Sequence, residues 1–185
     1  LSDVYLMLPR ISLVDPKQRQ RDIDLFKRML SFLIALETPG VTLSPGLVHP
    51  DTDEEATDRT VTALQEMMQA ARAATPATHL RVSIEPHMDS MAQTPAQALK
   101  LIEQVEGLEI TLDWAQLICQ DVFHDRITTL LPKARHIQIR QAARAQLQTP
   151  FERGRINLQK TVDTIKESDY AGVVCVEYMQ TKSDR

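Results

Sequence analysis

Four short apolar runs of the sequence end on polar residues that could bind a cation or move a proton. The runs RVSIEPH, EITLDW, HIQIRQ and VVCVEY carry Glu85, Asp113, Gln138 and Glu177 at or near their ends. Carboxylate and amide oxygens are ligands for hard divalent cations, and a carboxylate can also act as a general acid or base. These residues predict a site that binds a metal ion or transfers a proton, provided that the fold brings them together.

The apolar runs themselves are typical of buried parallel strands. Val, Ile and Leu dominate the runs, and in three of them the single acid comes at or near the end. A strand with one solvent-facing side would instead alternate polar and apolar residues. We therefore expect the runs to form buried strands whose acids meet at one end of a sheet.

Strand-like and helical patterns alternate along the whole chain. The expected strands are residues 4–8, 40–46, 80–85, 108–113, 136–140 and 173–178. The polar strand-end residues lie 28, 25 and 39 positions apart, and one βα unit takes about 30 residues. This alternation predicts an α/β fold with parallel strands. A (β/α)8 TIM barrel is favoured over a dinucleotide-binding open sheet, because the sequence has no G-x-G-x-x-G motif.

The chain is short for a complete barrel. It has 185 residues and 43% hydrophobic residues, which suits a globular domain, whereas an eight-unit barrel usually takes about 250 residues. Residues 1–185 are therefore expected to form one partial barrel domain. An N-terminal strand is expected to be missing, and the last unit could be missing as well.

The composition restricts the partners. A net charge of −4 argues against a nucleic-acid binder, which needs a basic face, and no apolar run approaches membrane-spanning length. Cys119 and Cys175 fit no paired metal spacing. These features predict a cytoplasmic protein with a small-molecule ligand, and they leave a homodimer open.

Three carboxylates in one barrel mouth need compensating positive charge. A Mg²⁺ or Mn²⁺ ion with the Gln138 amide oxygen would supply it. Arg140, two residues further along, lies on the same strand face as Gln138 and offers a second solution. In a purely structural alternative, Arg81, Arg140 and Arg144 form salt bridges with the acids.

Three histidines are candidates for substrate contacts. His87 follows Glu85 by two residues and is expected in the loop over the strand end, where it could titrate near neutrality. His136 precedes Gln138 by two residues, so it lies deeper on the same face, where a core hydrogen bond is the alternative. His49, in a polar loop, is a candidate for the rim of the site.

Several segments, in this order and spacing, resemble the xylose isomerase-like barrel superfamily of sugar isomerases, epimerases and AP-endonuclease-type enzymes. They are SIEPH followed by TPAQALKLIEQV, LEITLDWAQ, ARHIQIRQA and DYAGVVCVEY, within about Val4 to Tyr178. The resemblance implies a divalent metal held by a Glu, an Asp, a His and a second Glu. By position these are Glu85, Asp113, Gln138 and Glu177, with Gln138 where the family commonly has His.

Two more positions depart from the family pattern. Gln116 stands where a His often contacts the substrate, and Gln141 stands where an acid often follows the strand His. An amide is a poorer transition-metal ligand than imidazole. The resemblance therefore implies one weakly held Mg²⁺ or Mn²⁺ ion instead of a multi-metal phosphodiesterase site.

The function implied by the resemblance is a sugar or sugar-phosphate isomerase or epimerase. Glu85 and Glu177 would flank the substrate as an acid/base pair, and the metal would stabilise an enediolate next to the carbonyl. A dehydratase or aldolase-type enzyme on the same barrel is one alternative. A ligand-binding barrel that has lost catalysis is another, and the three Gln departures favour it.

Overall fold

Six parallel strands in sequential order form one sheet in the computed structural model, which describes residues 1–74 and 80–179. The strands are β1 (Val4–Leu6), β2 (Gly40–Leu43), β3 (Arg81–Ile84), β4 (Glu109–Asp113), β5 (Ala134–Ile139) and β6 (Val173–Val176). Each strand pairs with the next along the chain, which leaves β1 and β6 at the two edges. This arc confirms the predicted α/β fold, an incomplete TIM barrel.

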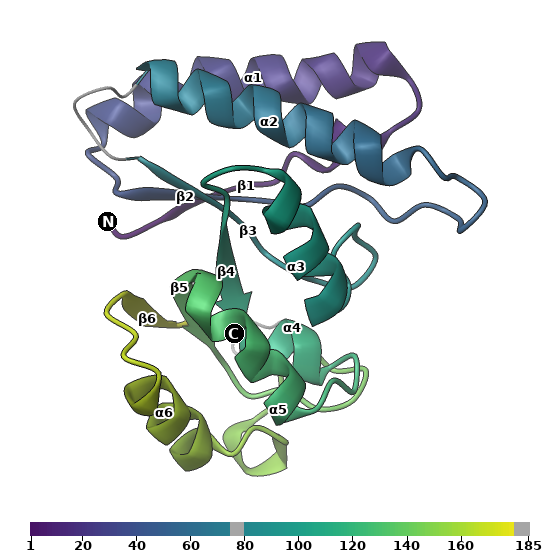
Figure 1. Ribbon diagram of the computed structural model, residues 1–185. Helices are drawn as coiled ribbons and strands as arrows, with labels where there is room; N and C mark the ends of the chain where they lie inside the picture. The colour runs from purple at the N-terminus through teal and green to yellow at the C-terminus, as the bar shows by residue number, and fades with distance from the viewer. Residues whose placement is uncertain (75–79, 180–185) are drawn as a thin grey trace.

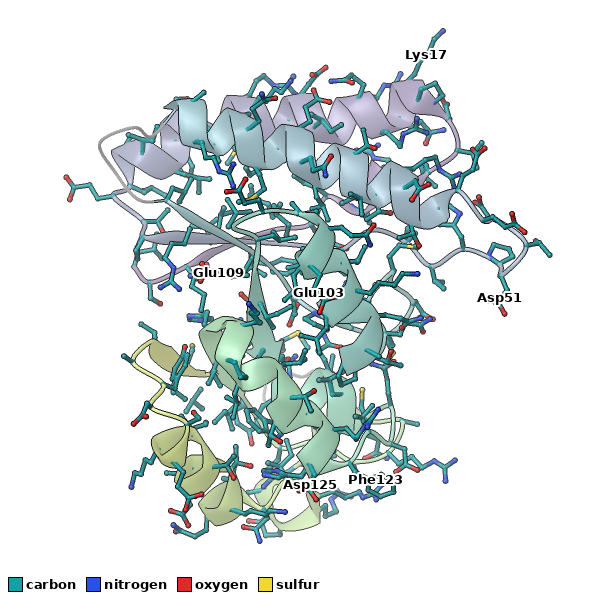
Figure 2. The ribbon with its side chains drawn as sticks, in the orientation of Figure 1. Lys17, Asp51, Glu103, Glu109, Phe123 and Asp125 are labelled. Carbon is teal, nitrogen blue, oxygen red and sulfur yellow. The ribbon has the colours of Figure 1, made fainter. Side chains whose placement is uncertain are left out.

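Helices connect the strands. They are α1 (Pro16–Ala35), α2 (Ala56–Ala74), α3 (Pro95–Gln104), α4 (Trp114–Ile118), α5 (His124–Ile127) and α6 (Leu158–Glu167), with 3-10 turns η1 (Pro9–Ser12), η2 (Thr128–Lys133) and η3 (Phe151–Arg153). Helices α1 and α2 lie side by side (Figure 1), and the loop that carries Asp51 extends outward before α2 (Figure 2). Among the helices of the described ranges, none has the length and apolar character needed to cross a membrane.

Helix α3 begins where the sequence predicts. The Thr94 hydroxyl accepts the Gln97 N–H at 3.3 Å, and the Gln97 side chain accepts the Thr94 N–H at 3.0 Å. Pro95 occupies the first helical position, where its missing N–H costs nothing. This reciprocal capping box fixes the point at which the loop after β3 turns into the helix.

The sheet has an apolar side and a polar side. Leu43, Ile84, Leu112 and Ile137 are fully buried in the hydrophobic core that the sheet forms with its helices. Alternate residues on the strands carry hydroxyl groups instead. Thr111 lies 2.7 Å from both the Thr42 and the Ser83 hydroxyl. Because side chains two positions apart share a face of a strand, this hydroxyl layer defines the face that carries the strand-end acids.

A β-bulge in β5 adds a charged residue to this face. Ile110 pairs with Ala134 but Thr111 pairs with His136, so Arg135 is the extra residue. The Arg135 guanidinium lies 2.9 Å from the Ser83 hydroxyl and 2.5 Å from an Asp3 carboxylate oxygen. This buried ion pair lies in the hydroxyl layer of the sheet.

Strand β6 differs from the expectation of a buried strand. Val173, Val174 and Val176 are 46%, 45% and 75% exposed, and Cys175 is only half-buried. The prediction of burial is wrong here because β6 pairs with β5 on one side and has no partner on the other side within the described residues. Continuous apolar sequence does not distinguish an edge strand from a central one.

Candidate active site

The strand-end acids occupy equivalent places on three strands. Asp113 is the last residue of β4, and Glu85 and Glu177 directly follow β3 and β6. The Glu85 N–H donates to the Leu43 carbonyl at 3.1 Å, and the Glu177 N–H donates to the Ile139 carbonyl at 3.0 Å, so the parallel hydrogen-bond ladder continues through both acids. The backbone therefore holds the three carboxylates at the carboxyl edge of the sheet.

Strand register places the predicted polar residues on one face. Gln138 pairs with Asp113 on one side and with Cys175 on the other. Glu85 and Asp113 lie two residues beyond Ser83 and Thr111 of the hydroxyl layer. The acids thus form the next layer on the same face, toward the end of the barrel where sites of this fold are built.

Arg140 links two of the three acids. Its Nη2 donates a hydrogen bond to Oδ2 of Asp113, and its Nη1 lies 3.1 Å from Oε2 of Glu177. The Arg140 and Asp113 side chains are 3% and 0% exposed, while Glu177 is 36% exposed. Oδ1 of Asp113 accepts the Ala115 N–H at 2.8 Å, as the N-cap of α4. Both Asp113 oxygens are therefore engaged by the protein.

Glu85 is the most perturbed acid of the site. Burial raises the pKa of Glu85 to about 8, and repulsion from Asp113 and Glu177 adds to this rise, whereas Arg140 and a hydrogen bond with Tyr5 oppose it. Burial also raises the pKa of Asp113 to about 6, against the attraction of Arg140. Glu85 is therefore protonated at neutral pH, and Asp113 is ionised in its ion pair.

Several buried polar atoms near the acids have no hydrogen-bond partner within the described residues. They are Oε1 of Gln138, Nδ1 of His136 and Nε of Arg140, besides Oε2 of Glu177, whose 3.1 Å contact with Arg140 is an ion pair without hydrogen-bond geometry. Burial lowers the pKa of His136, so its ring is neutral at neutral pH. Since buried polar atoms are normally paired, these three are candidates for contacts with a bound molecule.

His87 and Gln116 lie in the segments that follow the strand ends. The His87 Nε2 lies 3.4 Å from the Ser44 hydroxyl, and its Nδ1 lies 2.7 Å from the Met88 carbonyl oxygen. Gln116 is half-buried in α4, three residues after Asp113. Their roles as substrate contacts remain predictions.

His49 is held by its own loop and its neighbours. Its Nδ1 lies 3.0 Å from Asp53 and its Nε2 lies 3.1 Å from the Ser12 hydroxyl. A carboxylate, an imidazole and a hydroxyl in this order also form the Ser-His-Asp triad of hydrolases. Ser12 is fully buried, however, and its hydroxyl donates to the Leu47 carbonyl at 3.0 Å. These contacts fasten the loop to η1, and the rim role predicted for His49 stays a prediction.

Gln141 and two arginines serve the surrounding structure. Gln141 bonds the backbone of Ile156 through both ends of its amide, at 2.9 and 3.2 Å. Arg81 pairs with Glu109, and Arg144 is 76% exposed and lies 3.9 Å from Asp121. Of the arginines considered from the sequence, only Arg140 forms ion pairs with the strand-end acids in the described structure.

Tyr5 is a site residue that the sequence reading missed. It lies in β1 opposite Thr42, its hydroxyl lies 3.9 Å from the Met7 sulfur, and its interaction with Glu85 contributes to the pKa shifts of both groups. Burial raises the pKa of Tyr5, so its hydroxyl stays protonated. The available signal was a tyrosine between Val4 and Leu6, on the inward position of a short strand.

The arrangement of these residues does not fit a divalent cation. Arg140 already bridges Asp113 and Glu177, and each Asp113 oxygen already accepts one hydrogen bond from the protein. A second positive charge about 4 Å from a guanidinium costs about 4 kcal/mol per unit charge at an effective dielectric constant of 20. The predicted Mg²⁺ or Mn²⁺ ion would require Arg140 to leave both carboxylates.

The fold and the position of the site define a barrel protein of the α/β class with a polar site at the carboxyl ends of its strands. The sequence profile described as xylose isomerase-like TIM barrel matches residues 3–184. The chain belongs to this family. A search of curated proteins found no match.

Solved structures support the fold. One is an L-ribulose 3-epimerase, with 17% identity over 97% of this chain and 62% of that chain, at a TM-score of 0.80. A magnesium complex of a xylose isomerase-like TIM barrel protein from Mycobacterium smegmatis has 18% identity, 98% and 67% coverage and a TM-score of 0.75. The IOLI protein with a bound zinc atom has 18% identity, 99% and 69% coverage and a TM-score of 0.79. The chain spans about two thirds of the length of these structures.

Proposed function

We propose that this barrel is a sugar or sugar-phosphate isomerase or epimerase that moves a proton on the carbon next to a carbonyl group. The observation that carries this proposal is the meeting of Glu85, Asp113 and Glu177 around Arg140 at the carboxyl edge of the sheet. The family contributes the substrate class, because structures similar to this one include an L-ribulose 3-epimerase. The partner proposed is therefore a small sugar-like molecule.

The environments of Glu85 and Glu177 suit opposite roles. Glu85 is buried and protonated at neutral pH, so it can give a proton. Glu177 is partly exposed and lies 3.1 Å from Nη1 of Arg140, so its carboxylate can be reached by a substrate that gives up a proton. Two carboxyl groups whose environments set them apart in this way are the usual arrangement of an acid/base pair.

The proposed reaction balances with these groups. Glu177 takes the proton of the carbon next to the carbonyl, the C–H electron pair forms the enediolate double bond, and the carbonyl oxygen takes the negative charge. Arg140 donates a hydrogen bond to that oxygen. Glu85 then returns a proton to the carbon from the other face, and exchange with solvent resets both carboxyl groups.

A ligand-binding barrel without catalysis is the second candidate. Its support is the pairing of Arg140 with Asp113 and Glu177, together with glutamine at positions 116, 138 and 141. The homodimer and the cytoplasmic location predicted from the sequence also stay predictions, and the predicted divalent metal does not fit the contacts of Arg140. The acid/base proposal requires none of the three.

A substrate panel tests the proposal. Ketoses such as D-fructose, D-tagatose and L-ribulose are incubated with the parent protein, and products are identified by NMR. We expect one member of the panel to be converted into its epimer or isomer, and Glu85→Gln and Glu177→Gln to slow conversion by at least about 100-fold each. Glu103→Gln, at an exposed carboxylate on α3 (Figure 2), is the matched control and should retain activity. Binding without conversion would favour the second candidate.

A further inference from the structure

We infer that Arg140 is the resident cation of this site, so that the site binds a neutral polyhydroxy molecule without a divalent metal. The inference that the site binds no divalent metal is argued from the geometry alone. The polyhydroxy part deepens the proposed function and rests on it.

Arg140 places a buried positive charge between two of the strand-end acids. Arg140 is 3% exposed and forms ion pairs with the fully buried Asp113 and with Glu177. Arginine cannot lose its proton in a protein, so this positive charge is permanent. The carboxylates that would attract a divalent ion are thus already compensated by the chain itself, and a metal entering between them would face a fixed like charge.

The site offers few oxygen atoms that could coordinate a metal ion. One Asp113 oxygen accepts the Ala115 N–H and the other accepts Arg140. Gln138 offers a neutral amide oxygen at the position opposite Asp113 in the sheet. Mg²⁺ and Mn²⁺ need a set of several oxygen atoms in near-octahedral geometry, and among the described residues no group of three or more His, Cys, Asp or Glu side chains is placed to hold a metal ion.

Arg140 differs from Arg135, the second buried arginine on this face of the sheet. In Arg135, Nε lies 3.3 Å from the Ser83 hydroxyl, and Nη2 bonds Asp3, Ser83 and the threonines of the hydroxyl layer. In Arg140, Nε has no partner in the described part of the chain. Arg135 is therefore a structural ion pair, whereas Arg140 has a donor left for a ligand.

The remaining free atoms indicate the class of ligand. Oε1 of Gln138 is an acceptor, Nε of Arg140 is a donor, and Nδ1 of His136 is a third buried ring atom without a partner in the described structure. A hydroxyl group both donates and accepts, so adjacent hydroxyls of a sugar can satisfy this mixed set. An anionic ligand would instead lie beside the acidic side chains of Asp113 and Glu177.

Mn²⁺ binding tests the inference directly. Protein freed of metal with EDTA and then dialysed is titrated with MnCl₂ alone, and bound Mn²⁺ is read by EPR and calorimetry. We expect no saturable binding to the parent protein up to about 1 mM. We expect the double variant Gln138→His, Arg140→Ala to bind Mn²⁺ at least about tenfold more tightly than the parent.

Controls separate the site from general charge effects. Arg144→Ala removes one exposed positive charge and should leave Mn²⁺ binding at the parent level. Gln138→His alone, with Arg140 in place, should also remain at that level. If the double variant does not fold, the parent titration still decides: saturable binding that Glu85→Gln or Glu177→Gln abolishes would overturn the inference.

Different results would contradict the metal-free site and the proposed isomerase function. Ketose conversion that persists in EDTA supports both, and conversion that is lost in EDTA and restored by Mn²⁺ overturns the inference while keeping the isomerase. An absence of conversion under all conditions counts against the proposed function, and the Mn²⁺ titration of the parent still decides the metal question.

Discussion

Replacement of Glu85 by Gln should make the protein more stable relative to the parent as the pH rises. The folded state holds the Glu85 proton up to a pKa of about 8, whereas the unfolded chain releases it near 4.5. Between these values the unfolded state binds fewer protons, so the free energy of unfolding of the parent falls with rising pH. Gln resembles the protonated acid but does not titrate, so this loss disappears in Glu85→Gln.

The size of the effect follows from the same interval. From 4.5 to about 8 is 3.5 pH units, and each unit corresponds to about 1.4 kcal/mol, which sets an upper limit of roughly 5 kcal/mol. Repulsion from Asp113 and Glu177 contributes to the rise of the Glu85 pKa, so the interval is not the property of Glu85 alone and a single substitution recovers only part of it. We expect Glu85→Gln to gain about 2 to 3 kcal/mol on the parent between pH 5 and pH 8.

Urea unfolding at several pH values measures this gain. Glu103→Gln removes a carboxyl at an exposed position of α3 (Figure 2) and should show no comparable gain. A stability difference between Glu85→Gln and the parent that does not change with pH would show that Glu85 is not held in its protonated form. A Glu85→Gln variant that becomes less stable than the parent as the pH rises would contradict the expected direction of the effect.

Three further substitutions test the contacts of the site and its frame. Arg140→Ala leaves the buried Asp113 carboxylate without its cation and should lower the free energy of unfolding by roughly 3 to 5 kcal/mol at neutral pH, with part of the loss recovered in urea titrations below pH 6; a loss under about 1 kcal/mol would contradict the ion pair. Gln141→Ala removes two hydrogen bonds to Ile156 and should cost about 1 to 3 kcal/mol, with faster amide exchange over residues 142–156; unchanged exchange would argue against this anchor. Thr94→Ala removes the capping box of α3 and should cost about 1 kcal/mol by thermal unfolding, and recovery in Thr94→Ser is the control.

The fold could be predicted from the sequence because its signals are local and repeated. Apolar runs and helical spacing recur along the chain, Thr94 with Pro95 marks the start of α3, and the structure has the six strands expected within its described residues. The exposure of β6 could not be predicted in this way. An apolar run shows that a strand can be buried, but the neighbour that would bury it is a property of the whole sheet.

The candidate site could be predicted in outline but not in its electrostatics. Strand-end positions of Glu85, Asp113 and Glu177 follow from the strand pattern, and the same-face relation of Gln138 and Arg140 follows from the two-residue period of a strand. That Arg140 bonds Asp113 depends on side-chain geometry across two strands. Sequence spacing does not show whether a metal ion, as predicted, or an arginine compensates this charge.

The residues missed from the sequence lie outside the repeated pattern. Tyr5 sits within the first strand, where an aromatic residue is ordinary, and its contact with Glu85 comes from a strand two positions away in the sheet. Arg135 faces the hydroxyl layer because of the bulge in β5, and bulges shift the two-residue period that sequence reading relies on.

Deuterium incorporation from D₂O into the carbon next to the carbonyl of a converted ketose is the most direct test of the acid/base site. Parent protein in EDTA is compared with Glu177→Gln by NMR and mass spectrometry. Proton transfer through Glu85 and Glu177 predicts one deuterium per turnover with the parent and incorporation at least about 100-fold slower with the variant. Conversion without deuterium at that carbon, or equal incorporation by the variant, would contradict it.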